Sequence, residues 1–212
     1  MGYEDDGDAS RAVVAVLAAA AGVGAVITRT KLAKLLYLSD LRAVESLGQP
    51  MSGVRWQWLN HGPFDYDLLG LEARLVALGK VGRVEQANPF GTPEYRLTLV
   101  DDVVNVNIDS KFWEIVRGVV AEFGSYAASS LRDITYQTAP MIEAQKRGQR
   151  GVELDLDIIR PMPDAKAAVS RLLRKVGQLP VQDTEDGAME DLACDIRSLA
   201  KLRKRANRQL LS

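Results

Sequence analysis

Apolar residues recur at steps of three and four along two stretches near the start of the chain. The first covers residues 10–21, is rich in alanine and valine, and predicts a helix that ends at Gly22. The second predicts a helix that begins after Thr28 or Thr30, both acceptable caps, and ends at Gly48. Its apolar positions form a broad stripe: Leu32, Leu35, Leu36, Leu41, Val44 and Leu47.

The next part of the chain changes to short apolar runs between turn-forming residues. Val54–Leu59 is aromatic and β-branched and predicts a short strand, which His61-Gly62-Pro63 ends. Leucines at helical spacing then predict a third helix up to Gly79. Val81–Gln86 and Glu94–Thr98 predict a β-hairpin. This order of helix, strand, helix and hairpin resembles a winged helix.

Helical spacing returns after residue 110 and continues, with interruptions, to about Arg147. Val152–Ile158 then alternates apolar and acidic residues, which predicts a half-buried strand. Two more helices are predicted to begin near Asp164 and Met189.

These elements together predict a mainly α fold with a small β element, in the α+β class. We expect a flexible N-terminus over residues 1–9, one domain over residues 10–160, and a C-terminal helical extension over residues 161–212. With 212 residues, of which 47% are hydrophobic, the chain can bury one sizeable core.

Charge and cysteine content narrow the classes of function. The net charge is −1, so the chain as a whole does not have the basic character of a nucleic-acid binder. Its single cysteine, Cys194, allows neither an internal disulfide nor a thiol metal cluster, and a reducing cytoplasm is the expected compartment. The apolar run from Ala12 to Ile27 is too short and too alanine-rich to span a membrane.

Four segments carry a distinctive combination of residues. They are Thr30–Asp40, Trp58–Phe64 with its Gly-Pro turn, Tyr95–Thr98, and Leu131–Pro140. Together they resemble the Panacea domain, a family also called SocA-like and formerly of unknown function. Tyr136 stands where that family usually has histidine.

The resemblance implies a mostly helical domain that acts beside unrelated small toxins. Members of the family are antitoxins that neutralise a neighbouring toxin by binding it, or adaptors that present a toxin to a protease. The resemblance therefore implies a cognate protein toxin as partner. With one histidine and one cysteine, we expect no metal site, and no motif indicates a cofactor. The resemblance carries no settled catalytic mechanism, so we expect a protein that is not an enzyme.

Motif position suggests which residues contact the partner. The candidates are Tyr37, Asp40, Trp58, His61, Gly62, Pro63, Phe64 and Tyr66. The basic end of the last predicted helix offers further contacts: Lys201, Arg203, Lys204, Arg205 and Arg208. Aromatic side chains at such positions anchor interfaces, although they also build ordinary cores.

His61, the only histidine, has two interpretations. It is a general acid or base near Asp40, Asp65 and Asp67, or a residue that packs at a turn. In the second interpretation Asp65 and Asp67 cap a helix, and Asp40 lies on the polar flank of the leucine stripe. We favour the second, because no Ser or Cys nucleophile lies in a recognisable motif nearby. Likewise, Glu153, Asp155 and Asp157 form three carboxylates that can bind a hard cation, but strand alternation already explains them.

Three functions from different classes therefore stand at this point. The favoured one is a toxin-binding antitoxin or adaptor. The second is a winged-helix DNA-binding regulator, and the third is a small enzyme centred on His61. Self-association into a homo-oligomer is compatible with each.

Overall fold

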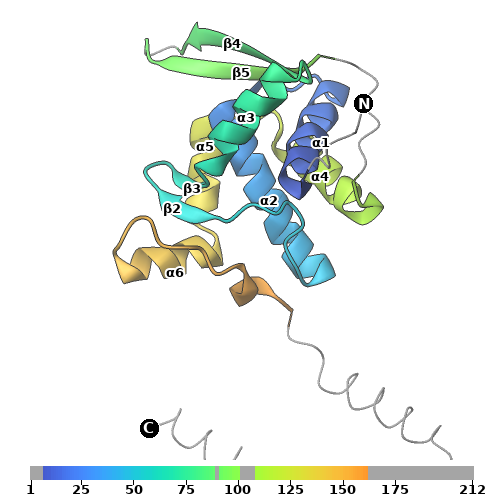
Figure 1. Cartoon of the computed structure of the whole chain (residues 1–212). Helices are drawn as coiled ribbons and strands as arrows, with labels where there is room; N and C mark the ends of the chain where they lie inside the picture. Colours follow the sequence, from blue (N-terminus) through green and yellow to red (C-terminus); the bar gives the residue numbers. More distant parts are fainter. Residues whose placement is uncertain (1–6, 89–90, 101–107, 162–212) are drawn as a thin grey trace, which may run out of the picture. The chain divides into compact units, whose positions relative to one another are not determined.

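The computed structural model describes residues 7–88, 91–100 and 108–161. The predicted C-terminal extension, with its basic end, lies outside the described residues. The described part is mainly helical with a small β component, as predicted (Figure 1). Its helices are α1 (Asp8–Gly22), α2 (Arg29–Leu47), α3 (Asp67–Ala77), α4 (Ser110–Phe123), α5 (Ala128–Tyr136) and α6 (Ala139–Arg147), and its strands are β1 (Ile27–Thr28), β2 (Gln57–Leu59), β3 (Gly62–Phe64), β4 (Val81–Ala87) and β5 (Pro93–Leu99).

Helix α2 is the centre of the core. It packs against α1, α4 and α5, and it is buried on nearly all sides, which is typical of a helix enclosed by others (Figure 1). Thr28 caps it by accepting a hydrogen bond from the Lys31 backbone at 3.4 Å. Gly48 ends it in the left-handed conformation with φ 81°, a conformation that favours glycine. Both ends agree with the predicted ones.

The three-stranded sheet has the order β1-β5-β4, with antiparallel pairing throughout. In a winged helix, a strand between the first two helices pairs with a hairpin that follows the third helix. The strand in that role is β1, however, and not the predicted Val54–Leu59. The sequence pattern does not predict β1, because two residues carry no periodicity.

The segment predicted as a strand over Val54–Leu59 forms a second, separate hairpin. Only Gln57–Leu59 is a strand, and it pairs with β3 so that Leu59 lies opposite Gly62. Asn60 and His61 therefore make the turn of a hairpin, and Gly62 begins its second strand.

Segment Val152–Ile158 is not the predicted strand. It forms one bridge, Gln57 to Glu153, and then turns into a short 3₁₀ helix, Leu156–Ile159. The Asp155 side chain starts this turn by accepting a hydrogen bond from the Asp157 backbone at 3.0 Å. Val152, Leu154 and Leu156 still point inward, whereas Ile158 is 44% exposed. The alternation therefore predicts burial correctly up to Leu156, although no continuous strand forms.

Glu72 holds α3 against both α2 and the sheet. Its buried carboxylate binds Arg29 through two hydrogen bonds, at 2.6 and 2.7 Å, and lies 3.4 Å from Arg83 on β4. The Arg29 guanidinium also stacks on the Tyr95 ring of β5, 4.1 Å from its centroid. These contacts fix the position of α3, the helix that leads away from the β2–β3 hairpin.

Within the described ranges, no helix has both the length and the apolar character needed to cross a membrane.

Candidate functional site

Three polar side chains lie buried along one line of α2. Lys34, Tyr37 and Asp40 are three residues apart, so they follow one another along the same side of the helix. Their exposed fractions are 1%, 0% and 0%. Each one binds a different part of the chain, and we call Lys34, Tyr37 and Asp40 the polar row.

Asp40 anchors the loop that leads into the β2–β3 hairpin. Its carboxylate accepts hydrogen bonds from the backbones of Met51 and Ser52, each at 2.9 Å, from the Ser52 hydroxyl, and from the Trp56 indole at 2.7 Å. Burial raises the pKa of Asp40, whereas these donors lower it. Asp40 therefore lies inside the core and not on an exposed polar edge of α2.

Tyr37 connects α2 to the turn between α5 and α6. Its hydroxyl lies 2.8 Å from the Thr138 hydroxyl, and its ring meets Trp56 edge to face at 5.4 Å. Burial raises the pKa of the Tyr37 phenol. Trp56 is buried in the core, and Trp58 is half-buried.

Lys34 holds the hairpin turn from beneath. Its ammonium group donates a hydrogen bond to the Pro63 carbonyl at 2.8 Å. Burial, together with the charge of Arg132, lowers the pKa of Lys34 to about 7. Gly62 lies directly above with φ 94°, and a Cβ there would come within 3.4 Å of the lysine nitrogen and 3.2 Å of the Tyr136 ring.

The polar row thus separates the eight predicted contact residues into two groups. Tyr37, Asp40, Gly62 and Pro63 are buried and hold the hairpin in place. The others reach the surface, fully or in part: Trp58, His61, Phe64 and Tyr66. We call these four residues the hairpin face. Tyr66 is 62% exposed, and its ring packs edge to face on Phe64 at 6.1 Å.

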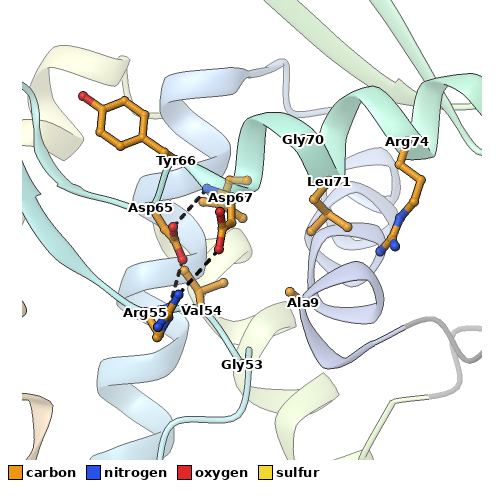
Figure 2. A pocket seen from close by; sticks show the side chains of 11 residues that line it. Ala9, Gly53, Val54, Arg55, Asp65, Tyr66, Asp67, Gly70, Leu71 and Arg74 are labelled. Carbon is orange, nitrogen blue, oxygen red and sulfur yellow. Dashed lines mark hydrogen bonds and ion pairs between the residues drawn. The ribbon is translucent and has the colours of Figure 1, made fainter.

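A cleft of about 490 Å³ adjoins the hairpin face. Figure 2 shows it between the start of α3, the extended residues 53–55 and Ala9 of α1. Arg55, Asp65 and Asp67 gather at one end, and Arg74 lies at the other. Asp65 accepts hydrogen bonds from the Asp67 and Arg55 backbones, at 3.0 and 3.1 Å.

The described side chains do not form a recognisable catalytic arrangement. His61 is exposed at the hairpin turn, while Asp40 is enclosed by its own donors. Asp65 and Asp67 do not cap α3 as predicted: the helix begins after Tyr66 without a side-chain cap, and Asp65 accepts a hydrogen bond from the Asp67 backbone just before it. Asp157 pairs with Arg160 at 2.7 Å. Among the described residues, no group of three or more His, Cys, Asp or Glu side chains is placed to hold a metal ion.

Helix α3 occupies the place of a winged helix's recognition helix, but its surface is not basic. Its exposed residues are Asp67, Leu69, Gly70, Ala73, Arg74 and Ala77. One acidic and one basic side chain leave no net charge for phosphate contacts.

Sequence reasoning missed the residues that hold the motif together. Lys34, Ser52, Thr135 and Thr138 are among them, and all lie in or beside the motif segments. A signal for Lys34 and Tyr37 was present, since their spacing of three places them on the buried side of a leucine-rich helix. No sequence signal indicates Ser52 or Thr138, because their partners are distant in the chain.

Fold and site together define a winged-helix-like domain that presents an aromatic face and a cleft on a buried polar support. Residues 32–140, just over half of the chain, match the family described as "Antitoxin SocA-like, Panacea domain". The chain belongs to this SocA-like Panacea family, and the family supports a toxin–antitoxin role in general. Comparisons with curated proteins and with solved structures gave no significant match.

The match begins in α2 and ends at the start of α6. It therefore includes the polar row, the hairpin face and the β4–β5 hairpin, but not α1.

Proposed function

We propose that this chain is an antitoxin that neutralises a cognate protein toxin by binding it through the hairpin face and the adjoining cleft. The observation that carries the proposal is the exposure of aromatic side chains on a turn that the polar row supports from within. Buried aromatic anchors supply much of the affinity of protein interfaces, because they bury a large area with few rotatable bonds. Family membership supports the toxin as the partner.

Neutralisation then occurs by occlusion. A toxin segment that fills the cleft meets an apolar middle, Val54 and Leu71, with charged groups at both ends. An adaptor role, in which a protease receives the bound toxin, requires the same contact and an additional docking step. Both roles depend on the hairpin face.

Growth rescue tests the proposal. The toxin to use is the product of the neighbouring reading frame that stops growth when expressed alone. Tyr66→Ala removes an exposed anchor, and loss of a central aromatic anchor costs about 2 kcal/mol, or roughly thirtyfold in affinity, so rescue should fail at low expression. Tyr126→Ala is the matched control, because Tyr126 is 43% exposed, packs edge to face on Phe123 and lies outside the cleft.

The same assay examines the enzyme interpretation. His61→Ala removes the only histidine. If the toxin is neutralised by contact alone, this variant retains partial rescue and Tyr66→Ala remains the more severe change. Complete loss of rescue with His61→Ala, while the binding affinity stays at the wild-type value, would support acid–base chemistry instead.

A DNA-binding regulator is the second candidate, and the winged-helix sheet order favours it. Binding to the chain's own promoter should then weaken steeply as salt rises, since phosphate contacts release counterions. The near-neutral surface of α3 predicts the opposite for the described domain, namely weak binding with a shallow dependence on salt.

A further inference from the structure

Strand β4 forms the outer edge of the three-stranded sheet. The order β1-β5-β4 leaves one side of β4 without a partner among the described residues, and residues 83–87 are exposed (Figure 1). Exposed edges are usually protected by lysine, proline or a bulge. Val81–Ala87 contains neither lysine nor proline, and it pairs with β5 over seven residues without a bulge.

The hydrogen-bond pattern identifies the backbone groups that face outward. At the two ends of the hairpin, Asn88 donates to the Thr92 carbonyl at 2.9 Å and Val100 donates to the Lys80 carbonyl at 3.1 Å. Antiparallel ladders bond every second residue, so Gly82, Val84 and Gln86 bond to β5. Arg83, Glu85 and Ala87 therefore direct their amides and carbonyls away from the sheet.

The side chains along this edge carry charges of both signs. Arg83 and Glu85 are two residues apart, so they lie on the same face of the strand and carry opposite charges. Glu85 has no ion-pair partner in the described part of the chain. Arg83 lies 3.4 Å from Glu72, but its side chain is 37% exposed and remains accessible.

We propose that β4 pairs antiparallel with β4 of a second copy of this chain, with Val84 opposite Val84 at a two-fold axis. Arg83 of each copy then faces Glu85 of the other, and unlike charges directly opposite stabilise a sheet. The outward backbone groups of Arg83 and Glu85 meet their counterparts in the hydrogen-bonded positions. The 61% exposed Val84 side chains meet on the opposite face of the sheet.

Charge selects this register over its neighbours. Only shifts by two residues keep the outward backbone groups opposite each other. Such a shift places Arg83 against Arg83 in one direction and Glu85 against Glu85 in the other, and like charges directly opposite destabilise the pair. The two-fold at Val84 is also the register in which all seven residues of β4 overlap.

Sedimentation velocity of the full chain over a wide concentration range tests the pairing. We expect the wild type to self-associate to a dimer, and Glu85→Arg to remain a monomer at the same concentrations because Arg83 then faces arginine. Glu114→Arg is the charge-matched control, since Glu114 is exposed on α4 and distant from β4 in the fold, and it should dimerise as the wild type does. A wild type that stays monomeric at the highest concentration, or a Glu85→Arg variant that dimerises equally well, overturns the proposal.

Hydrogen exchange of the wild type provides a second test that does not depend on a variant folding. The Arg83 and Glu85 amides should exchange quickly in dilute solution and slow down as the concentration rises. The Val84 and Gln86 amides, which bond to β5, should be protected at every concentration. Uniform exchange of Arg83 and Glu85 across the range contradicts the pairing, even if another surface forms a dimer.

Discussion

Lys34 shows that a residue inside a family motif can support the fold from within the core. Its place in the Thr30–Asp40 segment marks it as part of the motif, but its 1% exposure and its bond to the Pro63 carbonyl make it a support for the hairpin. An ammonium group in such a place opposes folding when charged. The protonation of Lys34 should therefore change the free energy of unfolding.

We expect the free energy of unfolding to rise between about pH 7 and pH 9.5 because of Lys34. The folded pKa of about 7 lies below the ordinary value of 10.5, so the folded chain binds fewer protons than the unfolded chain in this window. The destabilisation is fully present below about pH 7 and is relieved above it, with a slope of at most about 1.4 kcal/mol per pH unit. Urea unfolding across this window measures the slope.

Lys34→Met is the control for that measurement, since it keeps an unbranched stem and removes the titrating group. Burial also lowers the pKa of Lys31, and its contribution remains in the variant. The difference between wild type and Lys34→Met therefore isolates Lys34. If the free energy of unfolding changes with pH in the same way in both proteins, Lys34 is not a buried lysine that titrates in this window.

The β2–β3 hairpin shows what sequence analysis can and cannot predict about an element. Aromatic and β-branched residues predict the extended segment, and His61-Gly62-Pro63 predicts a turn. The partner strand is not predicted, because β3 contains glycine and proline and has no alternation. The same holds for Val152–Ile158, where inward positions were correct up to Leu156 and the strand was wrong, since Asp155 and Asp157 favour a turn over a ladder.

Gly62→Ala should loosen this hairpin more than an ordinary glycine substitution. Alanine at φ 94° is strained, and its Cβ would lie 3.2 Å from the Tyr136 ring and 3.3 Å from the Thr135 hydroxyl. Backbone strain with crowding costs about 1–3 kcal/mol. Thermal melting measures the loss, which corresponds to a fall in Tm of several degrees, at about 2–4 °C per kcal/mol for a chain of this size.

Gly79→Ala separates crowding from backbone strain alone. Gly79 follows the C-cap of α3 with φ 69° and has open space where a Cβ would stand, so the substitution adds backbone strain alone, about 1 kcal/mol. An equal fall in Tm for Gly62→Ala and Gly79→Ala would show that the hairpin turn is not packed against Lys34 and Tyr136 as described.

At the largest scale, the described residues combine a winged-helix-like order of elements with an α3 surface that carries no net charge. The sequence predicts this order, because helices and hairpin follow from periodicity. The division of the motif into a buried row and an exposed face cannot be predicted from one sequence. It depends on which side of α2 meets residues 51–64 and Thr138, and these contacts join positions up to 101 residues apart.

The β4 edge and the hairpin face are different surfaces, so dimerisation and toxin binding are independent. A dimer would display two hairpin faces and two clefts. Failure of either proposal therefore leaves the other intact. The central claim is that the exposed residues of the motif contact the toxin, while the buried ones only hold them in place.

A calorimetric titration of the purified chain with the purified neighbouring toxin tests that claim most directly. The account predicts a stoichiometric complex, whose affinity falls roughly thirtyfold with Tyr66→Ala and stays at the wild-type value with Tyr126→Ala, while both variants melt at the wild-type temperature. Equal affinity of Tyr66→Ala and wild type, or no complex at all with a toxin that the chain neutralises in cells, would contradict it.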